Sequence, residues 1–359
     1  MKRIDRRTFL GAGASLAAWS MLPGLGMAQQ ASGLRQVRLG VGLKAMSPIV
    51  INLVIGEILG YNAAEGFTLN TLALGTNANV QVAVDRGEVD FGVGVPSFGL
   101  PVLAQGDWKL ARNFYQYTYP YKWDIAVLPD SPVQSYADLK GLRIGVSDFG
   151  ATDYPVTRNV LRLQGLDPDG DLQWIAVGNG VPAGVALRRQ AVDALAYFDT
   201  GFGQIEAAGL PFRLLPRPDN LPLVGGQFLQ TRVSTLDSHP QWAVGLGRSV
   251  SKASTFILEN PRAGALAFLR MYPETAPRGA SQDAAVEAVL QAISRRIKLY
   301  SPPYPDVPMG YIEVSEFRTE ADMTGLQIAD YAPFYTNDLI GQIDDYDHEA
   351  IRTQARSYT

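Results

Sequence analysis

Residue types that carry out covalent chemistry are scarce in this chain of 359 residues, which has no cysteine and only two histidines. The absence of cysteine excludes disulfides, thiolate metal sites and a cysteine nucleophile, and two histidines cannot build a three-histidine metal site. A serine hydrolase needs a histidine base, but His239 lies in a Ser-His-Pro turn and His348 lies in an acidic tail. No G-x-S-x-G sequence occurs either. The sequence therefore predicts that the protein is not an enzyme.

One glycine-rich segment, 178–184, is similar to a dinucleotide-binding loop because it follows a predicted strand and opens a predicted helix. Asp199 stands about 20 residues further on, where such a site holds its ribose-binding acid. The glycines, however, are spaced G-x-G-x-x-x-G, one residue longer than the dinucleotide fingerprint. Val181 and Pro182 favour helix initiation instead. The sequence therefore predicts no cofactor and no metal.

Residues suited to binding a small molecule stand at the ends of predicted strands, in five loops. Hydroxyls, amides and free N–H groups at helix starts can hold polar or anionic groups, and glycine lets the backbone approach a ligand. The candidate ligand-binding residues, from these loops and from an extended segment at 113–128, are Lys44, Ser47, Asn77, Pro96, Ser97, Phe98, Tyr117, Thr152, Asp153, Tyr154, Tyr197 and Asp199. Ser47 and Asn77 could equally be helix caps without any ligand.

Two of these candidates are acids, and their charge bears on the class of ligand. Asp153 near a helix start and Asp199 at a strand end would repel a simple anion such as nitrate if both faced a cleft. They would favour a ligand with amine or amidine donors, and Asp199→Asn would then weaken binding without lowering the stability of the free protein. Asp153 can also be explained as an ordinary acidic residue in the first turn of a helix.

Aromatic residues alternate along the extended segment, at positions 115, 117, 119, 121 and 123. Within one strand this spacing places them on a shared face, where some could wall a cleft and stack on a flat ligand. The alternative is a half-exposed tyrosine ladder that supports a strand pair, and Pro120 limits how regular that strand can be. Aromatic and acidic residues together favour a cyclic, nitrogen-bearing solute such as a pyrimidine.

The elements that must position these residues repeat in two α/β units. Predicted strands and helices alternate in the first unit, with strands at 36–42, 67–74 and 88–95 and helices at 48–64 and 78–86. The second unit repeats the pattern, with strands at 142–147, 172–177 and 193–198 and helices at 153–164, 181–190 and 203–208. This order predicts parallel sheets with crossover helices. The region from about residue 241 is mainly helical, with helices predicted at 242–259, 261–271 and 281–299.

The chain passes between the two units twice, along the extended segment 113–128 and again near 216–228. Parallel sheets of open α/β folds bind ligands at the carboxyl ends of their strands. Two such ends that face one another would form a cleft at the interface. The sequence thus predicts a two-lobed clamp.

The N-terminus has the features of an export signal. Basic residues precede a weakly apolar, Gly- and Ala-rich segment, and Ala28 ends a small-residue cleavage site. Arg6-Arg7 followed by Thr-Phe-Leu is similar to the twin-arginine motif, although Asp5 stands where that motif usually has Ser or Thr. A membrane anchor is the alternative, but Gly and Pro interrupt a segment that is short for a span. We expect cleavage after Ala28, with residues 1–28 as a signal peptide and the protein exported to the periplasm by the twin-arginine route.

Several stretches carry a resemblance to a known family. They are the first strand VRLGVGLK (37–44), the step RGEVDFG (86–92), the segment DLKGLRIGV (138–146), the helix start GATDY (150–154) and, near the end, FYTNDL (334–339). In this order they resemble periplasmic substrate-binding proteins of ABC importers in the nitrate, sulfonate, taurine and thiamine-pyrimidine-precursor group (NMT1/THI5-like, SsuA-like). The last stretch resembles that family's C-terminal helix. One departure is Phe198-Asp199-Thr200, where many relatives have Trp-Asp-Pro.

The resemblance implies an α/β, periplasmic-binding-protein-like type II fold, with two lobes joined by a two-crossing hinge and a helical C-terminal segment. We expect lobe 1 at 35–118 and 222–359, lobe 2 at 124–216, and the hinge near 117–124 and 214–224. The implied function is capture of a small organic solute for delivery to an ABC permease in the inner membrane, by a monomer. A module that presents solute to a sensory receptor is the alternative. The formal charge of −4 gives no indication of nucleic-acid binding.

Overall fold

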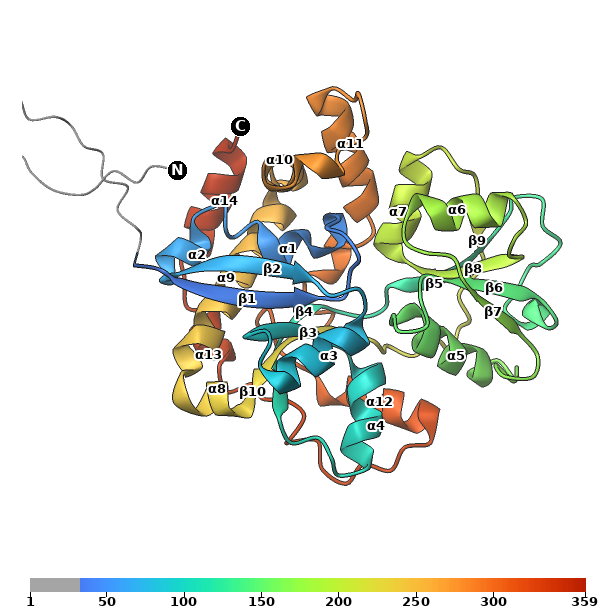
Figure 1. Cartoon of the computed structure of the whole chain (residues 1–359), viewed down its shortest axis with the longest axis horizontal. Coiled ribbons are helices and arrows are strands. Elements are labelled where there is room, and N and C mark those ends of the chain that lie inside the picture. Colours follow the sequence, from blue (N-terminus) through green and yellow to red (C-terminus); the bar gives the residue numbers. More distant parts are fainter. Residues whose placement is uncertain (1–32) are drawn as a thin grey trace, which may run out of the picture. The chain divides into compact units, whose positions relative to one another are not determined.

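The computed structural model describes residues 33–359 (Figure 1). The predicted signal peptide and its cleavage site lie outside the described residues. Residues Leu34 to Thr359 form one compact unit. None of the helices in residues 33–359 is both long and apolar enough to span a membrane.

Two five-stranded sheets form the framework of the described residues. Sheet A has the order β2-β1-β3-β10-β4, with β1 at Arg35–Val41, β2 at Phe67–Ala73, β3 at Phe91–Gly94, β4 at Ala111–Thr118 and β10 at Gln227–Arg232. Sheet B has the order β7-β6-β8-β5-β9, with β5 at Trp123–Val127, β6 at Arg143–Val146, β7 at Gln173–Ala176, β8 at Ala194–Phe198 and β9 at Arg213–Leu214. The α/β fold class expected from the sequence is therefore confirmed.

One strand in each sheet runs against its neighbours, so the sheets are mixed rather than parallel throughout. β10 pairs antiparallel with β3 and β4, and β5 pairs antiparallel with β8 and β9. These two strands directly follow the chain's passages between the sheets. A strand that starts where the chain arrives, at the carboxyl-end edge, must run away from that edge. The sequence analysis missed β10, because its strand residues follow a proline-rich break.

Helices cover both faces of each sheet (Figure 1). One core joins sheet A to α1, α9 and α10, and a second core on the opposite face joins it to α3, α4 and α12. In sheet B the two cores involve α5 on one face and α6 with α7 on the other. The helix bounds are α1 Ile51–Val54, α2 Tyr61–Ala64, α3 Asn77–Arg86, α4 Pro96–Ala104, α5 Asp153–Leu163, α6 Val181–Arg188, α7 Asp199–Ala207, α8 Val233–Ser238, α9 Pro240–Glu259, α10 Pro261–Met271, α11 Gln282–Ile293, α12 Val314–Thr324, α13 Ile340–Ile343 and α14 His348–Ser357. Short 3₁₀ turns lie at Pro48–Val50, Ala137–Leu139, Pro273–Thr275 and Ile297–Leu299.

Three predicted helices differ from the structure. The region 48–64 is broken into a 3₁₀ turn, α1 and α2, with Gly60 at a φ of +80° before α2. The region 281–299 is helical only to Ile293 and ends in a separate 3₁₀ turn. The stretch 334–339 is wrong as a helix, because it consists of turns and one bridge between Tyr335 and Asn113. The helix begins only at Ile340.

An equivalent arginine–aspartate ion pair holds the first strand of each βαβ unit. Asp90 accepts hydrogen bonds from the Arg38 backbone N–H (2.8 Å) and Nε (3.2 Å), and Asp193 accepts them from Arg143 N–H (2.9 Å) and Nε (3.0 Å). Burial by itself would raise the pKa of Asp90, but the hydrogen bonds from Arg38 outweigh it and lower the pKa. Hydrogen bonding to Arg143 lowers the pKa of Asp193.

These lowered pKa values predict acid sensitivity. A carboxyl with a pKa below its unfolded value of about 3.9 contributes stability above that pH and loses it as the pH falls. The free energy of unfolding should therefore drop as the pH goes below about 4, and less steeply in Asp90→Asn and Asp193→Asn. Urea unfolding from pH 3 to 6 measures this. Asp107→Asn, which changes an aspartate that is 70% exposed, is the control, and equal slopes in all variants would contradict the assignment.

Candidate functional site

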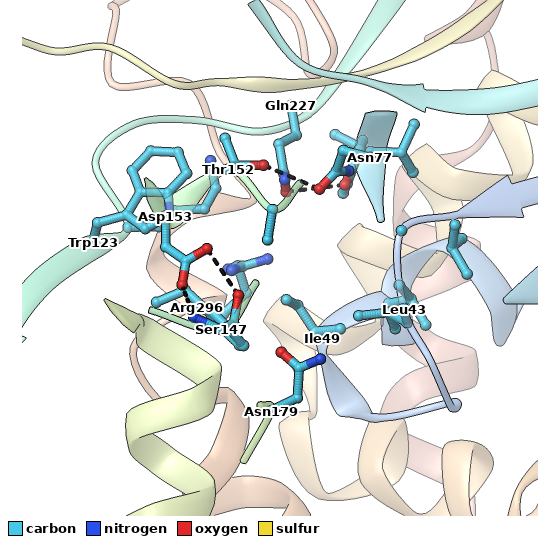
Figure 2. Close-up of a pocket in the computed structure, with 18 residues that line it drawn as sticks. Leu43, Ile49, Asn77, Trp123, Ser147, Thr152, Asp153, Asn179, Gln227 and Arg296 are labelled. Carbon is cyan, nitrogen blue, oxygen red and sulfur yellow. Dashed lines mark hydrogen bonds between the residues drawn. The ribbon is translucent and has the colours of Figure 1, made fainter. Parts of the chain in front are cut away.

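A pocket with a cavity volume of about 60 Å³ lies between the two sheets (Figure 2). Its walls come from the carboxyl ends of strands: Val41 ends β1, Tyr117 lies near the end of β4, and Phe198 ends β8. This is the edge at which open α/β sheets bind ligands. The volume corresponds to only a few water molecules, so a larger solute requires the walls to separate.

Polar contacts join the two sides of the pocket. Asn77, at the start of α3, accepts a hydrogen bond through Oδ1 from Thr152 Oγ1 at 3.1 Å, just before α5 (Figure 2). At the exposed rim, Lys44 Nζ lies 3.0 Å from Asp148. Exposed pairs of this kind contribute little free energy. The contact between Thr152 and Asn77 is buried, and both residues line the pocket.

Asp153 is buried against its own side of the pocket. Its two carboxylate oxygens accept hydrogen bonds from Ser147, one from the backbone N–H at 2.6 Å and one from Oγ at 2.8 Å. Burial raises the pKa of Asp153 to about 7, although these hydrogen bonds oppose the shift. The side chain is therefore partly protonated at neutral pH, and one acceptor position on each oxygen is already occupied.

Asp199 does not line this pocket; it holds an arginine that does. Its two carboxylate oxygens accept hydrogen bonds from Arg296, at 2.7 Å from Nε and 2.5 Å from Nη2. Both side chains are buried, with 0% exposure for Arg296 and 3% for Asp199. The two charges compensate one another, so Asp199 adds no net negative charge beside the pocket.

Lys122 lies in the passage from sheet A to sheet B and also lines the pocket. Its Nζ donates to the Gly225 carbonyl at 2.5 Å and lies 4.5 Å from the centre of the Trp123 ring. Burial and the nearby Arg296 lower the pKa of Lys122 to about 7. Desolvation thus leaves a cation that is easily neutralised, in the lining of the pocket.

Aromatic rings complete the walls. Tyr117, Trp123 and Phe198 line the pocket, and the Tyr117 hydroxyl donates to Gln227 Oε1 at 3.0 Å. The four tyrosines of the alternating series are all buried rather than half-exposed, at 0–6% exposure. They do not share one strand face, because β4 ends at Thr118 and β5 begins at Trp123.

Four of the twelve predicted residues meet in this pocket: Asn77, Tyr117, Thr152 and Asp153. The other eight lie elsewhere, and their ligand contacts stay predictions. Ser47 precedes the 3₁₀ turn at Pro48–Val50 without a side-chain cap, and Ser97 donates to Glu320 at 2.6 Å. The Tyr197 hydroxyl bonds the backbone of residues 178 and 180. The remaining five outside the pocket are Lys44, Pro96, Phe98, Tyr154 and Asp199.

The sequence analysis did not select five polar residues that line the pocket: Lys122, Ser147, Asn179, Gln227 and Arg296. Arg296 had a detectable signal, because it follows Val289, Ala292 and Ile293 on the apolar side of a predicted helix. A buried arginine on an apolar face requires a partner. Its partner Asp199 is 97 residues away in sequence, which no local pattern can show.

Helix α7, which begins with Asp199, packs directly on α11. A Cβ on Gly203 would lie 2.5 Å from both Ala292 Cα and the Gln291 carbonyl oxygen. Gly203→Ala should therefore force the helices apart and cost about 1–3 kcal/mol of the free energy of unfolding. Gly341→Ala, in α13 with nothing within 4 Å, should instead be neutral or stabilising. Urea unfolding of both variants checks this, and a neutral Gly203→Ala would contradict the packing.

Solved structures define the class to which this fold belongs. The sulfonate-binding protein SsuA from Xanthomonas axonopodis matches with a TM-score of 0.60 at 20% identity, covering 87% of this chain and 99% of its own. The nitrate-binding protein NrtA from Synechocystis matches with a TM-score of 0.62 at 13% identity, covering 91% and 99%. A protein from Bordetella bronchiseptica gives 0.66 at 23% identity, covering 86% and 97%. The chain has the fold of periplasmic binding proteins.

Its family is given by the sequence. The sequence model of the NMT1/THI5-like family matches residues 47–264, more than half of the chain. The chain therefore belongs to this family, which confirms the resemblance carried by its motifs. Arg296 lies beyond the matched residues. Comparison with curated proteins gives no match.

Proposed function

We propose that the protein is the solute-binding component of an ABC importer, and that it captures a small organic solute in the pocket between the sheets. The observation that carries this proposal is that the pocket is lined from both sheets at their carboxyl ends. Membership of the NMT1/THI5-like family supports it. An exported monomer, sent to the periplasm by the twin-arginine route and docking on a membrane permease, completes the proposal.

The proposed mechanism is a hinge closure. Lobe 1 comprises 35–118 and 222–359, lobe 2 comprises 124–216, and the hinge lies near 117–124 and 214–224. These passages contain little regular structure between β4 and β5 and between β9 and β10, which suits bending. A solute that contacts both lobes binds the closed form better, and so shifts the population toward it.

A thermal-shift screen tests the proposal with the purified protein against sulfonates, nitrate, aminopyrimidines, aromatic carboxylates and amines. A ligand that binds the folded state raises Tm in a saturable way. Ala151→Trp fills the pocket, which Ala151 lines, and should abolish the shift. Ala191→Trp, at an exposed position in the bend that precedes β8, is the control. A shift that survives Ala151→Trp, or no shift with any compound, would contradict the proposal.

A further inference from the structure

One helix from each proposed lobe packs directly on the other. α7 belongs to lobe 2 and α11 to lobe 1, and they lie side by side in Figure 1. Gly203 allows this close approach, because a Cβ there would lie 2.5 Å from both Ala292 Cα and the Gln291 carbonyl oxygen. The two lobes are therefore in backbone contact here. We call this contact, together with Arg295 and Arg296 just beyond α11, the α7–α11 joint.

Each helix of the joint is fixed in the core of its own lobe. Phe202 and Ile205 of α7 lie in the core of sheet B, at 0% and 1% exposure. Val286 and Ile293 of α11 lie in the core that α11 shares with α9, α10 and sheet A, at 2% and 0% exposure. Moving either helix with the other lobe would expose these apolar side chains to water, which is unfavourable. The joint therefore holds the lobes at a fixed separation at this point.

Two arginine–carboxylate pairs cross the joint. Arg296 donates two hydrogen bonds to Asp199, at 2.7 and 2.5 Å, and both side chains are at most 3% exposed. Arg295 donates two to Glu206, each at 2.7 Å. Two-bond pairs of this kind are among the strongest side-chain hydrogen bonds, and both pairs would have to break if the lobes parted here.

Backbone hydrogen bonds connect both ends of the joint to the first passage between the sheets. The Asp199 N–H, at the start of α7, donates to the Lys122 carbonyl at 2.8 Å. The Tyr119 N–H donates to the carbonyl of Leu299, in the 3₁₀ turn that follows α11, also at 2.8 Å. Tyr119 and Lys122 both belong to the proposed hinge at 117–124. The joint and this passage therefore form one continuous support.

Contacts between the lobes on the other faces of the two sheets are of a weaker kind. Thr152, just before α5, donates one neutral hydrogen bond to Asn77, at the start of α3. Water can replace either partner of such a bond when the lobes separate, so its net contribution is small. Lys44 and Asp148 form an exposed ion pair, which contributes little. Met323 of α12 packs on the core of sheet B, but it is only partly buried.

The helices involved lie on different faces of the sheets. The core with α11 and the core with α3 are on opposite faces of sheet A, and the core with α7 and the core with α5 are on opposite faces of sheet B. In Figure 1, α7 and α11 lie above the strands, whereas α3 and α5 lie below them. The strong contacts are therefore on one side of the molecule and the weak contacts on the other.

We propose that the α7–α11 joint is a third hinge element, about which the lobes rotate so that the pocket opens between α3 and α5. Solute then enters past Asn77 and Thr152. The pocket wall at Phe198 and Arg296 keeps its shape during this motion, because the Asp199–Arg296 pair stays intact. The inference rests on the proposed hinge closure, and it adds to that mechanism a pivot and an entrance.

Single thiols can test this inference, because the chain has no cysteine of its own. Val41→Cys places a thiol at a pocket-lining position with 0% exposure, and Ala292→Cys places one in the joint at 2% exposure. Val84→Cys is the matched control, because Val84 is 0% exposed in the core with α3 and lies outside the pocket. Val289→Cys, one turn earlier on α11 at 4% exposure, replaces Ala292→Cys if that variant does not fold. The rate of reaction with the thiol reagent DTNB measures how often each position becomes exposed.

We expect the pocket thiol to react at least about tenfold faster than the joint thiol and the core thiol, because opening requires less free energy than unfolding. Opening exposes little surface, so the rate at Val41→Cys should hardly change with urea below the unfolding transition. The rate at Ala292→Cys should rise with urea in parallel with the rate at Val84→Cys.

Two further substitutions in the Val41→Cys protein separate the two sides. Thr152→Val removes the hydrogen bond to Asn77, and should speed reaction of the pocket thiol about two- to tenfold, the effect of one hydrogen bond. Arg295→Met removes the pair with Glu206 across the joint, and should leave the rate unchanged, because that pair does not part when the pocket opens.

Two results would overturn the inference while the lobes still open and the solute-binding function stands. One is a joint thiol that reacts as fast as the pocket thiol, and the other is an Arg295→Met variant that speeds the pocket thiol as much as Thr152→Val does. If the pocket thiol reacts only as fast as the core thiol, the inference and the hinge closure both fail. Failure of the solute-binding function alone looks different: the pocket thiol reacts, but the thermal-shift screen finds no ligand.

Discussion

Asp199→Ala should lower the free energy of unfolding by about 3–5 kcal/mol, because it leaves the buried Arg296 guanidinium without its partner. The pair is buried, with Asp199 at 3% and Arg296 at 0% exposure. Two hydrogen bonds of 2.7 and 2.5 Å join them. Removing one partner of such a pair leaves the other charge buried, with neither a counter-ion nor hydration by water to stabilise it.

The chain supplies a matched control on the same two elements. Arg295 forms an equivalent two-bond pair with Glu206, also on α7, at 2.7 Å for both bonds. That pair is one-third exposed on each side, so Glu206→Ala should cost no more than about 1 kcal/mol. Urea unfolding at pH 7 measures both variants. Equal losses would show that burial does not set the energy of the Asp199 pair.

This result would also correct the expectation that Asp199→Asn weakens binding without changing stability. That expectation treated Asp199 as a cleft carboxylate free to meet a ligand. The structure makes it the positioning partner of Arg296, so its replacement should affect both properties. Unchanged stability in Asp199→Ala would favour the original interpretation.

Local sequence patterns predicted those features of the fold that depend on contacts between residues close together in the sequence. The alternation of strands and helices, the helix from Asp153, and the acidic step at Asp90 all depend on residues near in sequence. The fold class followed from their order. Antiparallel β10 did not, because the direction of a strand that returns from another lobe depends on where the chain arrives.

The site was predicted in part for the same reason. Asn77, Thr152 and Asp153 stand at helix starts after parallel strands, where a general rule places ligands. Lys122 and Arg296 enter the pocket from a passage between sheets and from beyond α11, where no such rule applies. The charge of a pocket depends on which acids find internal partners, and only three-dimensional contacts reveal that.

Four buried ionisable groups should give the stability of the protein a minimum near pH 7. Burial raises the pKa values of Asp153, Glu316 and Glu320 to about 7. Unfolded carboxyls titrate at about 4, so from pH 4 to 7 the folded protein binds more protons than the unfolded chain. Stability supplied by these acids is therefore full below about pH 4 and is lost as the pH rises to 7.

Lys122 produces the opposite slope above pH 7. Its pKa is lowered to about 7, whereas an unfolded lysine titrates at about 10.4. Between these values the unfolded chain binds the extra proton, so stability rises with pH by up to about 1.4 kcal/mol per unit. This rise in stability ends near pH 10. Burial raises the pKa values of Tyr117 and Tyr119, so above that pH tyrosine ionises in the unfolded chain before it does in the folded protein, and the stability that these tyrosines contribute is lost.

One backbone position contacts groups responsible for both the fall in stability below pH 7 and the rise above it. Gly225 donates its N–H to Glu320 at 3.2 Å, and its carbonyl accepts from Lys122 at 2.5 Å. Glu320→Gln should therefore flatten part of the fall from pH 4 to 7 and keep the rise above 7. Lys122→Met should keep the fall in stability from pH 4 to 7 and remove the rise in stability between pH 7 and 9.

Urea unfolding from pH 4 to 9 distinguishes these variants. Lys140→Met is the control, because that lysine side chain is 71% exposed and its loss should leave the shape of the profile unchanged. A rise above pH 7 that persists in Lys122→Met would mean that Lys122 stays charged when buried. The ammonium would then need an anionic partner in addition to the neutral Gly225 carbonyl. The pH profile of the free protein thus tests, before any solute is known, the charge state of a buried lysine that lines the pocket.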